Sequence, residues 1–331
     1  MTDLSIVIVC YKGWDRLNKC LDSLNSFTGK NFSTEVIVVD NKSDDETIIQ
    51  IEDCFPKFRF VYNSINGGFA NGSNLGAGDS SGEFILFLNP DTVATESEIE
   101  KLLNIAKQNP DYTIVSCRQV NEKDKESIST GPFPSIFNLT GFQRAIFGSF
   151  TFHPAFAKAT AGKAAQITPD ITFPDWISGS VVLIRNETFK KLGGFDEDFW
   201  MYFEDVDLCK RVRNLNGEVS FCGDINIEHN HGGSSRINLR TTSLTKTEVH
   251  ISRHVYISKH KTGIEKLLIQ TFLVLNNLIS GAIMALLGIL LFFIPKVFSR
   301  TLIFFMLIGY YVGSAARFSW ISHRSVNFYK F

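Results

Sequence analysis

Short apolar runs alternate with segments of helical spacing through the first 120 residues. Residues 5–10 and 35–40 are rich in β-branched side chains and predict two buried strands. The apolar residues between these runs recur at helical spacing: Trp14, Leu17, Leu21 and Leu24. A strand, a helix and a strand in this order form a βαβ unit, which builds a parallel sheet and places ligands at the carboxyl ends of its strands. Residues 10–12 and 40–43 occupy those ends.

The same alternation continues to residue 194 and predicts an α/β fold with a central, mostly parallel sheet. Further strands are predicted at four apolar runs, residues 58–62, 84–88, 114–117 and 181–184. A capping box at residues 95–98 begins a helix that ends near Pro110, and residues 187–192 predict a short helix closed by Gly193-Gly194. Residues 121–174 are polar and interrupted by Gly and Pro, which predicts a long loop region over the site.

A glycine-rich segment, residues 66–76, follows the third predicted strand. Its glycines permit the backbone to approach a ligand closely, and the residues after them predict a helix. The spacing of the glycines and their place after the third strand exclude a dinucleotide-binding fingerprint.

Asn89-Pro90-Asp91 follows the buried strand at residues 84–88. Two oxygen ligands at the end of a central strand, with the backbone fixed between them by Pro90, predict a seat for Mg²⁺ or Mn²⁺ bridging a pyrophosphate. An ordinary turn is the alternative interpretation.

Residues 195–209 mix carboxylates with large aromatic side chains. Acidic groups among apolar side chains lose water, so their proton affinities change and a general base becomes available near neutral pH. The alternative is that Glu204, Asp205 and Asp207 only favour the N-terminus of a helix.

His229 and His231 lie beside a loop of small residues. A single His is more often structural, but a His pair next to glycines and acidic residues is a candidate ligand pair for a metal.

The composition narrows the class of protein. The chain has 331 residues, of which 44% are hydrophobic and 20% charged, so it has room for one large or two modest domains. The net charge is −1 and Lys and Arg are dispersed, which argues against a nucleic-acid partner. The six cysteines show no CxxC spacing and fit a reduced compartment. The chain enters a strand near Leu4 without a basic and apolar leader, so we expect no cleaved signal and a cytoplasmic catalytic part.

The C-terminal part is strongly apolar. Residues 267–294 contain no Asp, Glu, Lys or Arg, and this stretch exceeds the roughly 20 residues that cross a bilayer. Residues 301–315 form a second apolar stretch that is short for a span. Three interpretations stay open: a helical hairpin that crosses the membrane, a helix pair in the cytoplasmic interface, and a buried helical core.

Seven motifs now stand in one order. They are Asp40-Asn41-Lys42-Ser43, Asn66-Gly67-Gly68-Phe69-Ala70, Asn89-Pro90-Asp91, Trp176-Ile177-Ser178-Gly179, Gly194-Phe195-Asp196-Glu197, Glu204-Asp205-Val206-Asp207 and His229-Asn230-His231-Gly232-Gly233-Ser234. This order resembles family 2 glycosyltransferases of the GT-A fold, and within them the rhamnosyltransferase-like branch, over about residues 3–262. The resemblance implies a GT-A type nucleotide-binding fold and inverting transfer from a nucleotide-diphosphate sugar in one displacement.

The resemblance also implies a role for each site residue. The catalytic group is Asp205 as base, with Glu204 and Asp207 to orient the acceptor or the base. The ligands of Mg²⁺ or Mn²⁺ are Asp91 and His229, with His231 as the alternative and Asn89 as a weaker ligand. The donor-binding residues are Cys10, Tyr11, Asp40, Asn41, Asn66, Gly67, Gly68, Asn74 and Asn89. The acceptor-binding residues are Trp176, Ser178 and Gly179, with Trp176 as an apolar platform for a sugar face.

The resemblance does not fix the donor sugar. We expect dTDP-L-rhamnose, and UDP-galactofuranose or another UDP-sugar is the alternative. The apolar segment, residues 267–315, predicts attachment to the cell inner membrane and a lipid-linked saccharide acceptor in surface polysaccharide synthesis. We expect a cytoplasmic catalytic domain at residues 1–262 and membrane-associated helices at residues 263–331. A non-catalytic nucleotide-sugar or polysaccharide-binding membrane protein stays open. A sugar nucleotidyltransferase is excluded, because residues 10–14 offer no glycine-rich triphosphate loop.

Overall fold

The computed structural model describes residues 2–139, 170–230 and 238–328. The chain divides into two compact units. The sheet unit consists of Met1–Asn66, Gly72–Phe195 and Asp205–His231, and the helical unit consists of Gly67–Asn71, Asp196–Glu204 and Gly232–Phe331. The expected domain boundary between residues 262 and 263 stays a prediction.

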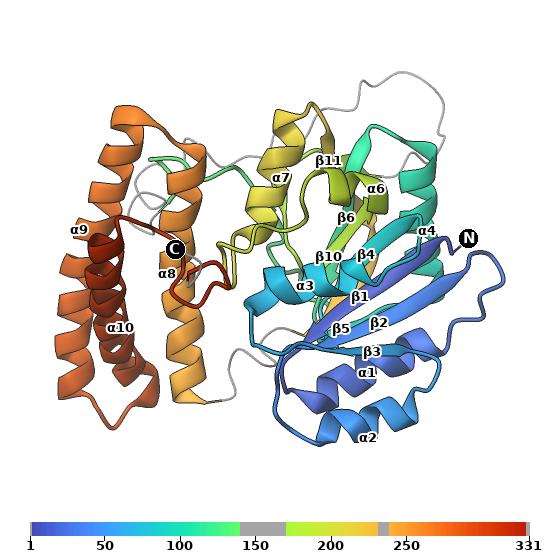
Figure 1. The fold of residues 1–331 in the computed structure, drawn as a ribbon, viewed down its shortest axis with the longest axis horizontal. Helices are drawn as coiled ribbons and strands as arrows, with labels where there is room; N and C mark the ends of the chain where they lie inside the picture. The colour runs from blue at the N-terminus through green and yellow to red at the C-terminus, as the bar shows by residue number, and fades with distance from the viewer. Residues whose placement is uncertain (1, 140–169, 231–237, 329–331) are drawn as a thin grey trace. The chain divides into compact units, whose positions relative to one another are not determined.

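Within the described residues, nine strands of the sheet unit form one sheet (Figure 1). Their spatial order is β3 (Arg59–Tyr62), β2 (Thr34–Asp40), β1 (Leu4–Cys10), β4 (Phe84–Leu88), β10 (Val181–Arg185), β6 (Tyr112–Val120), β11 (Glu218–His229) and β5 (Thr92–Val93), with β8 (Ile171–Thr172) paired to β11. The longest pairings, β1 with β2 and β6 with β11, are parallel, whereas β10 lies antiparallel between β4 and β6. The predicted central, mostly parallel sheet is therefore confirmed.

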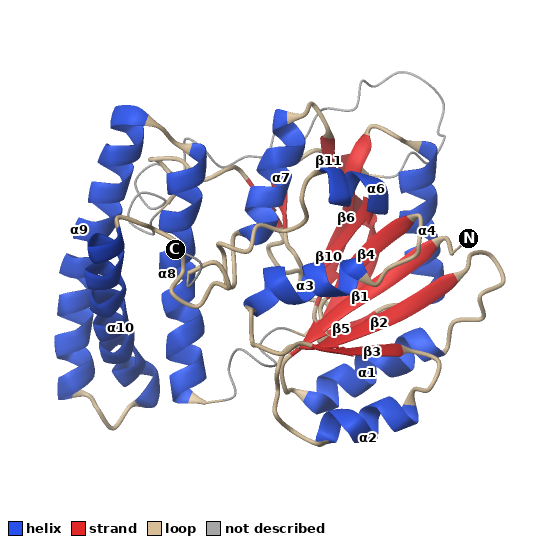
Figure 2. Ribbon diagram, viewed as in Figure 1, coloured by secondary structure: helices blue, strands red, loops and turns tan. Residues whose placement is uncertain are grey.

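Helices cover both faces of this sheet (Figure 2). One face packs against α1 (Trp14–Asn25), α2 (Thr47–Cys54) and α4 (Glu96–Gln108), and the other face is covered by α3 (Gly68–Gly78), α6 (Asn186–Lys191) and α7 (Glu204–Asn214). Ile6 and Ile8 of β1 point into the first of these cores, while Val7 meets Gly76 of α3 on the other side. A Cβ on Gly76 would lie 2.5 Å from Val7 Cγ1, so the close approach of α3 requires glycine.

The predicted start of α4 and the predicted end of α6 are both confirmed. Thr95 Oγ1 accepts a hydrogen bond from the Glu98 backbone N–H at 3.3 Å, and the Thr95 backbone N–H donates to Glu98 Oε2 at 2.8 Å, so the predicted capping box of α4 is present. Gly193 and Gly194 after α6 have φ angles of 80° and 75°, which is the left-handed conformation expected for glycine there.

The elements missing from the sequence prediction include α2, β5, β11 and α8. β11 has register shifts after Glu218 and Cys222, so its apolar positions do not alternate regularly. The helix α8 (Leu239–His260) buries polar side chains among its apolar ones, including Ser243, Thr247, Glu248 and His254. Its sequence therefore carries no apolar stripe. The region expected as a loop also contains short strands, β8 and β7 (Thr130–Gly131), and β7 pairs with β9 (Trp176–Ile177), which follows that region.

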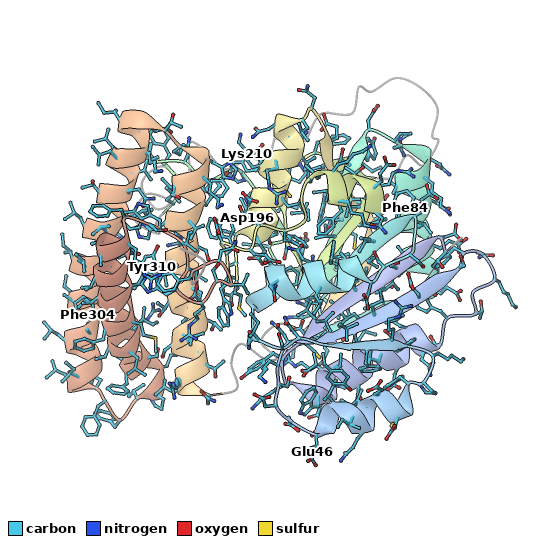
Figure 3. The ribbon with its side chains drawn as sticks, viewed as in Figure 1. Glu46, Phe84, Asp196, Lys210, Phe304 and Tyr310 are labelled. Atoms are coloured by element: carbon cyan, nitrogen blue, oxygen red, sulfur yellow. The ribbon has the colours of Figure 1, made fainter. Side chains whose placement is uncertain are left out.

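The helical unit contains three long helices within the described residues: α8, α9 (Gly263–Leu290) and α10 (Pro295–Arg317). α9 and α10 are long and apolar enough to cross a membrane, by length and composition. The second apolar stretch, expected to be short, lies in a helix of 23 residues because the helix begins at Pro295, ahead of the apolar run. Tyr310 lies between the helices of this unit (Figure 3).

The three helices are joined by buried polar contacts. Gln270 Nε2 donates to the His254 carbonyl at 2.8 Å, and Asn277 Nδ2 donates to the Tyr311 hydroxyl at 2.8 Å. Gln270 and Asn277 are 5% and 4% exposed, whereas Ile279, two residues further on the same helix, is 62% exposed. In α9 the polar side chains therefore face inward and many apolar side chains face outward.

Candidate active site

The acidic group after β4 meets the histidine at the end of β11. β5 pairs antiparallel with β11 and places His229 opposite Thr92, so Asp91 lies next to the imidazole. His229 Nε2 is 3.1 Å from Asp91 Oδ1, and Arg16 Nη1 is 3.5 Å from Asp91 Oδ2. The Asn89 side-chain amide lies 3.5 Å from His229 Nε2. Burial raises the pKa of Asp91, but His229 and Arg16 lower it more, so the pKa lies below its ordinary value.

The other ring nitrogen of His229 is held by a buried glutamine. His229 Nδ1 lies 2.8 Å from Gln119 Oε1, which also accepts the Ser180 hydroxyl at 2.6 Å. Because this oxygen only accepts hydrogen bonds, the network places a hydrogen on Nδ1 and turns Nε2 toward Asp91. Gln119 and His229 are 0% and 3% exposed, so the imidazole orientation is fixed from inside the sheet.

Asp205 lies in the first turn of α7 and is connected to the same region of the sheet unit. Its Oδ2 accepts the Gly179 backbone N–H at 2.7 Å, and its Oδ1 accepts the Val206 backbone N–H at 2.8 Å. Burial raises the pKa of Asp205 above its ordinary value, against these two hydrogen bonds, which lower it. Ser180, which follows Gly179, bonds Gln119, so a continuous path of neighbouring groups runs from Asp205 to His229.

The other two acidic candidates of this segment have different surroundings. Asp207 is buried, and its Oδ2 is 2.8 Å from Arg211 Nε, while Arg211 also donates to the carbonyls of Leu192 and Gly194. This ion pair ties α7 to the end of α6. Glu204 is buried at the first position of α7 and belongs to the helical unit.

The donor-side candidates at the carboxyl ends of β1 and β2 form a polar cluster. Both carboxylate oxygens of Asp40 accept the Ser43 backbone N–H at 3.2 Å. Asn41 donates to Asn66 Oδ1 at 3.3 Å and accepts from Asn63 Nδ2 at 2.9 Å. Asp40 and Asn41 are almost fully buried at this strand edge.

Cys10 and Tyr11 follow different patterns at the end of β1. The Cys10 side chain lies in the hydrophobic core, so only its backbone reaches the strand end, where its carbonyl accepts the Asn41 N–H at 2.8 Å. Tyr11 is partly exposed, with the Lys12 ammonium 5.8 Å from its ring centroid.

The glycine-rich segment is explained mostly by its own packing. A Cβ on Gly68 would lie 1.7 Å from the Trp200 carbonyl oxygen, and Gly68 has a φ angle of 81°, so glycine is required there. At Gly67 a Cβ would meet the Asn71 side chain at 2.2 Å. Asn74 exchanges two 2.8 Å hydrogen bonds with the Phe195 backbone and so fixes the chain after α6.

The acceptor-side candidates border Asp205. Trp176 is partly buried, and its indole N–H donates to the Pro132 carbonyl at 2.9 Å. The Ser178 hydroxyl lies 2.9 Å from the Ser180 hydroxyl, and Gly179 binds Asp205. His231 lies outside the described residues.

Sequence reasoning did not find Gln119, Ser180 and Arg16. A buried polar residue near the end of an otherwise apolar strand is a usable signal, and Gln119 at the end of β6 fits it. Arg16 gave no such signal, because basic residues in the first turn of a helix are common on surfaces. Its guanidinium bonds the Asn230 carbonyl as well as Asp91, so it joins α1 to the end of β11.

The pair Asp91 and His229 fits one side of a divalent-metal site. His229 Nε2 and Asp91 Oδ1 lie 3.1 Å apart, and an imidazole nitrogen and a carboxylate oxygen attract each other at this distance only with a proton or a cation between them. Within the described ranges no group of three or more His, Cys, Asp or Glu side chains is placed to hold a metal. A metal bound largely by substrate phosphates needs only one or two protein ligands, so the pair is sufficient.

The chain is similar to known glycosyltransferases. Residues 5–161 match the glycosyl transferase family 2 domain, and residues 164–231 match a domain described as the N-terminal domain of galactosyltransferase. Low-salt glycan biosynthesis hexosyltransferase Agl10 of Haloferax volcanii is 28% identical over 234 residues, which cover 70% of this chain and 68% of that protein. N-acetylglucosaminyl-diphospho-decaprenol L-rhamnosyltransferase of Mycobacterium tuberculosis is 30% identical over 224 residues, which cover 64% of this chain and 71% of that protein.

A solved structure shares the fold. GalNAc-T7 with UDP, GalNAc and Mn²⁺ superimposes with a TM-score of 0.54 at 15% identity, over 78% of this chain. This chain spans half of the length of that one. The likeness confirms the predicted GT-A type fold. With the domain match and the 30% identical relative, it follows that the chain belongs to glycosyl transferase family 2.

Proposed function

We propose that this glycosyltransferase moves L-rhamnose from dTDP-L-rhamnose to a hydroxyl group of a lipid-linked saccharide in surface polysaccharide synthesis. The observation that carries the proposal is the path from Asp205 through Gly179-Ser180 and Gln119 to His229 and Asp91. The path connects two acidic groups, one for the acceptor-side base and one for the donor-side metal ligand.

In the proposed reaction, Asp205 takes the proton of the acceptor hydroxyl. The acceptor oxygen forms a bond to the anomeric carbon while the bond from that carbon to the diphosphate oxygen breaks, and the electron pair leaves with the nucleotide diphosphate. A single displacement of this kind inverts the anomeric configuration. The burial that raises the pKa of Asp205 makes its carboxylate a stronger base, and the N–H groups of Gly179 and Val206 fix its direction.

On the donor side, Asp91 and His229 would hold Mg²⁺ or Mn²⁺, with Asn89 beside them. When bound, such an ion offsets the negative charge that gathers on the departing diphosphate. Gln119 keeps the His229 ring turned toward Asp91, and Arg16 adds a positive charge at the other carboxylate oxygen.

The remaining assignments follow from position. Asp40 and Asn41 lie at the carboxyl ends of parallel strands, where nucleotides bind in sheets of this kind, and we assign them to the nucleoside of the donor. Trp176 lies next to Ser178-Gly179, which borders the base, and we assign it to an apolar face of the acceptor sugar.

The proposed acceptor is lipid-linked because of the helical unit. α9 buries Gln270 and Asn277 and exposes Leu268, Ile279 and Leu286. An apolar exterior around a polar interior reverses the arrangement of a helix pair in water and suits contact with lipid. The name of the mycobacterial relative includes a decaprenol diphosphate acceptor, which supports the same class for this chain. We therefore assign the protein to the inner membrane with its sheet unit in the cytoplasm.

A galactosyl donor is the second candidate, because residues 164–231 match a galactosyltransferase domain. UDP-galactofuranose and UDP-galactose are its test compounds. The same site residues would serve, since the diphosphate and the acceptor hydroxyl are common to all these donors.

A thermal-shift screen of the full-length protein in detergent tests the proposal. Each nucleotide sugar is added with Mn²⁺, and Asp91→Ala serves as the variant with an impaired donor side. A ligand at a hundred times its Kd stabilises the fold by about 2.7 kcal/mol, so the donor should raise the melting temperature clearly. Stabilisation by dTDP-L-rhamnose supports the assignment, stabilisation by a UDP-sugar alone replaces the donor, and no response to any nucleotide sugar contradicts the function.

A further inference from the structure

The residues just before the proposed base have an unusual backbone. Tyr202 and Phe203 have φ angles of 72° and 68°, a left-handed conformation that aromatic side chains seldom adopt. Glu204 and Asp205 follow directly in the chain. Two consecutive residues of this kind persist only when surrounding contacts hold the segment in place. Residues 196–203 are called the acidic segment below, and their conformation requires such contacts.

One lysine of α8 binds two carboxylates of the acidic segment. Lys259 Nζ lies 2.6 Å from Asp196 Oδ2 and 2.5 Å from Asp198 Oδ2. The side chain of Asp196 can be followed in Figure 3. The three side chains are mostly buried, with exposures of 27%, 24% and 17%. A single ammonium shared by two partly desolvated carboxylates draws both into one fixed geometry.

The chain after α10 binds the same segment from its own end. This C-terminal segment, residues 319–328, donates three hydrogen bonds: Ser322 N–H to the Asp198 carbonyl at 3.3 Å, Ser325 Oγ to the Glu197 carbonyl at 2.6 Å, and Asn327 Nδ2 to Asp198 Oδ1 at 2.9 Å. Backbone carbonyls accept two of the three bonds, so they fix the path of the main chain as well as its side chains.

Further contacts reach the residues closest to the base. Ser252 Oγ donates to the Met201 carbonyl at 2.9 Å, and Phe203 packs edge-on against Tyr256 with ring centroids 5.9 Å apart. The Arg324 guanidinium lies 5.5 Å from the Trp200 ring. Trp200, Met201 and Phe203 thus each contact α8 or the C-terminal segment.

These anchors flank the apolar helix pair in the chain. Lys259 lies four residues before α9 begins at Gly263, and residues 319–328 follow α10 directly. We propose that α8 and the C-terminal segment form a brace that holds the acidic segment and thereby positions Glu204 and Asp205 for transfer, with Lys259 as the principal positioning residue. The helix pair then does more than attach the enzyme to lipid, because both of its ends lead into the brace.

Hydrogen–deuterium exchange and transfer kinetics on the full-length protein test this inference, which rests on the proposed function for its kinetic part. Peptides covering residues 196–214 are compared between wild type, Lys259→Ala and Lys259→Arg. Lys261→Ala is the matched control, because Lys261 is two residues away and pairs with Glu265 instead. Transfer is measured as release of dTDP from dTDP-L-rhamnose in native membranes, which supply the acceptor.

We expect Lys259→Ala to speed exchange in the acidic segment about tenfold, as local opening becomes easier. Its kcat should fall at least about tenfold while the donor KM changes less than about threefold, because the donor side is intact. Lys259→Arg should retain most of both properties, since a guanidinium also bridges two carboxylates. Ser325→Ala should change both readouts in the same direction by a smaller factor, which guards against a folding defect peculiar to position 259.

Three results would overturn the brace. The first is wild-type exchange in Lys259→Ala, the second is faster exchange with unchanged kcat, and the third is an equal loss in the Lys261→Ala control. A wild-type protein that turns over no nucleotide sugar contradicts the proposed function instead. In that case the exchange data alone decide whether the acidic segment is braced.

Discussion

Replacing Asp205 by asparagine is the most direct test of the assigned base. Asp205 accepts one backbone N–H at each oxygen, from Gly179 at 2.7 Å and from Val206 at 2.8 Å. The amide introduced by Asp205→Asn keeps one acceptor and turns an NH₂ group toward the other N–H. The variant therefore removes the proton acceptor and also weakens one hydrogen bond.

The two effects have different sizes. Loss of a general base lowers kcat by about 100-fold to 10,000-fold. Loss of a hydrogen bond to a charged group destabilises the fold by about 1.5–3 kcal/mol. A domain stable by about 5–15 kcal/mol stays almost entirely folded after such a loss. Unfolding accounts for a decrease of a few per cent in activity, so a decrease of 100-fold or more has to come from the chemistry.

The assay measures kcat and donor KM in native membranes, with the melting temperature as a check of folding. Asp3→Asn is the matched control, because Asp3 Oδ2 also accepts a backbone N–H, from Ser33 at 2.9 Å. Asp3 lies before the amino end of β1, whereas the donor-side candidates lie at the carboxyl end of that strand. We expect kcat to fall by about 100-fold or more in Asp205→Asn but not in Asp3→Asn, with the donor KM of both variants within a few-fold of wild type. Activity near that of wild type would remove Asp205 from the mechanism and transfer the role to Glu204 or Asp207.

Three further predictions concern the metal, a buried acid and the helices. Asp91→Ala should weaken metal-dependent donor binding and flatten the metal dependence of the rate, and an unchanged wild-type rate in the presence of a chelator would refute the metal assignment. Burial raises the pKa of Glu248 from 4.5 to about 7, against the Ser322 hydroxyl and Arg324, which lower it. The stability that protonated Glu248 contributes is complete below pH 4.5 and is lost as the pH rises through 7. Glu248→Gln should therefore raise the free energy of unfolding at pH 8 by up to about 3 kcal/mol, and with it the melting temperature, but should change neither at pH 4.5. Equal pH profiles of wild type and variant would refute this. Truncation after residue 261 should leave nucleotide-sugar binding within a few-fold but lower transfer strongly, and an insoluble, non-binding product would contradict the separation of the donor site from α9 and α10.

Local sequence pattern was sufficient for the elements with one apolar face or one apolar run. β1, β2 and β4 are continuous apolar runs because both faces of a parallel sheet are covered. α1 and α4 carry apolar stripes that the sheet buries. α8 failed this test because its buried positions include Ser243, Thr247, Glu248 and Ser252, which find partners within the helical unit. A helix whose buried face is polar has no periodic pattern of hydrophobic residues from which it could be predicted.

The candidate site divides in the same way between local and distant information. Asn89-Pro90-Asp91 and Glu204-Asp205 are compact motifs, so the sequence alone was sufficient to name them as candidates. Gln119 is 110 residues from His229, and its contact depends on the parallel register that sets Gln119 beside Ile227. No spacing rule within one sequence predicts that register.

A residue that matches a family motif can be required by local packing instead of by the ligand. Gly68 matches the expected donor loop, yet the 1.7 Å approach of the Trp200 carbonyl already requires a glycine there. Asn74 likewise is engaged by the Phe195 backbone through both of its side-chain atoms. These residues shape the chain around the acidic segment and the end of α6, so their substitution would disturb the base through its surroundings whether or not they contact the donor. Mutational loss of activity at Gly68 or Asn74 therefore does not identify a donor contact, whereas a selective rise in donor KM at Asp40 or Asn41 would.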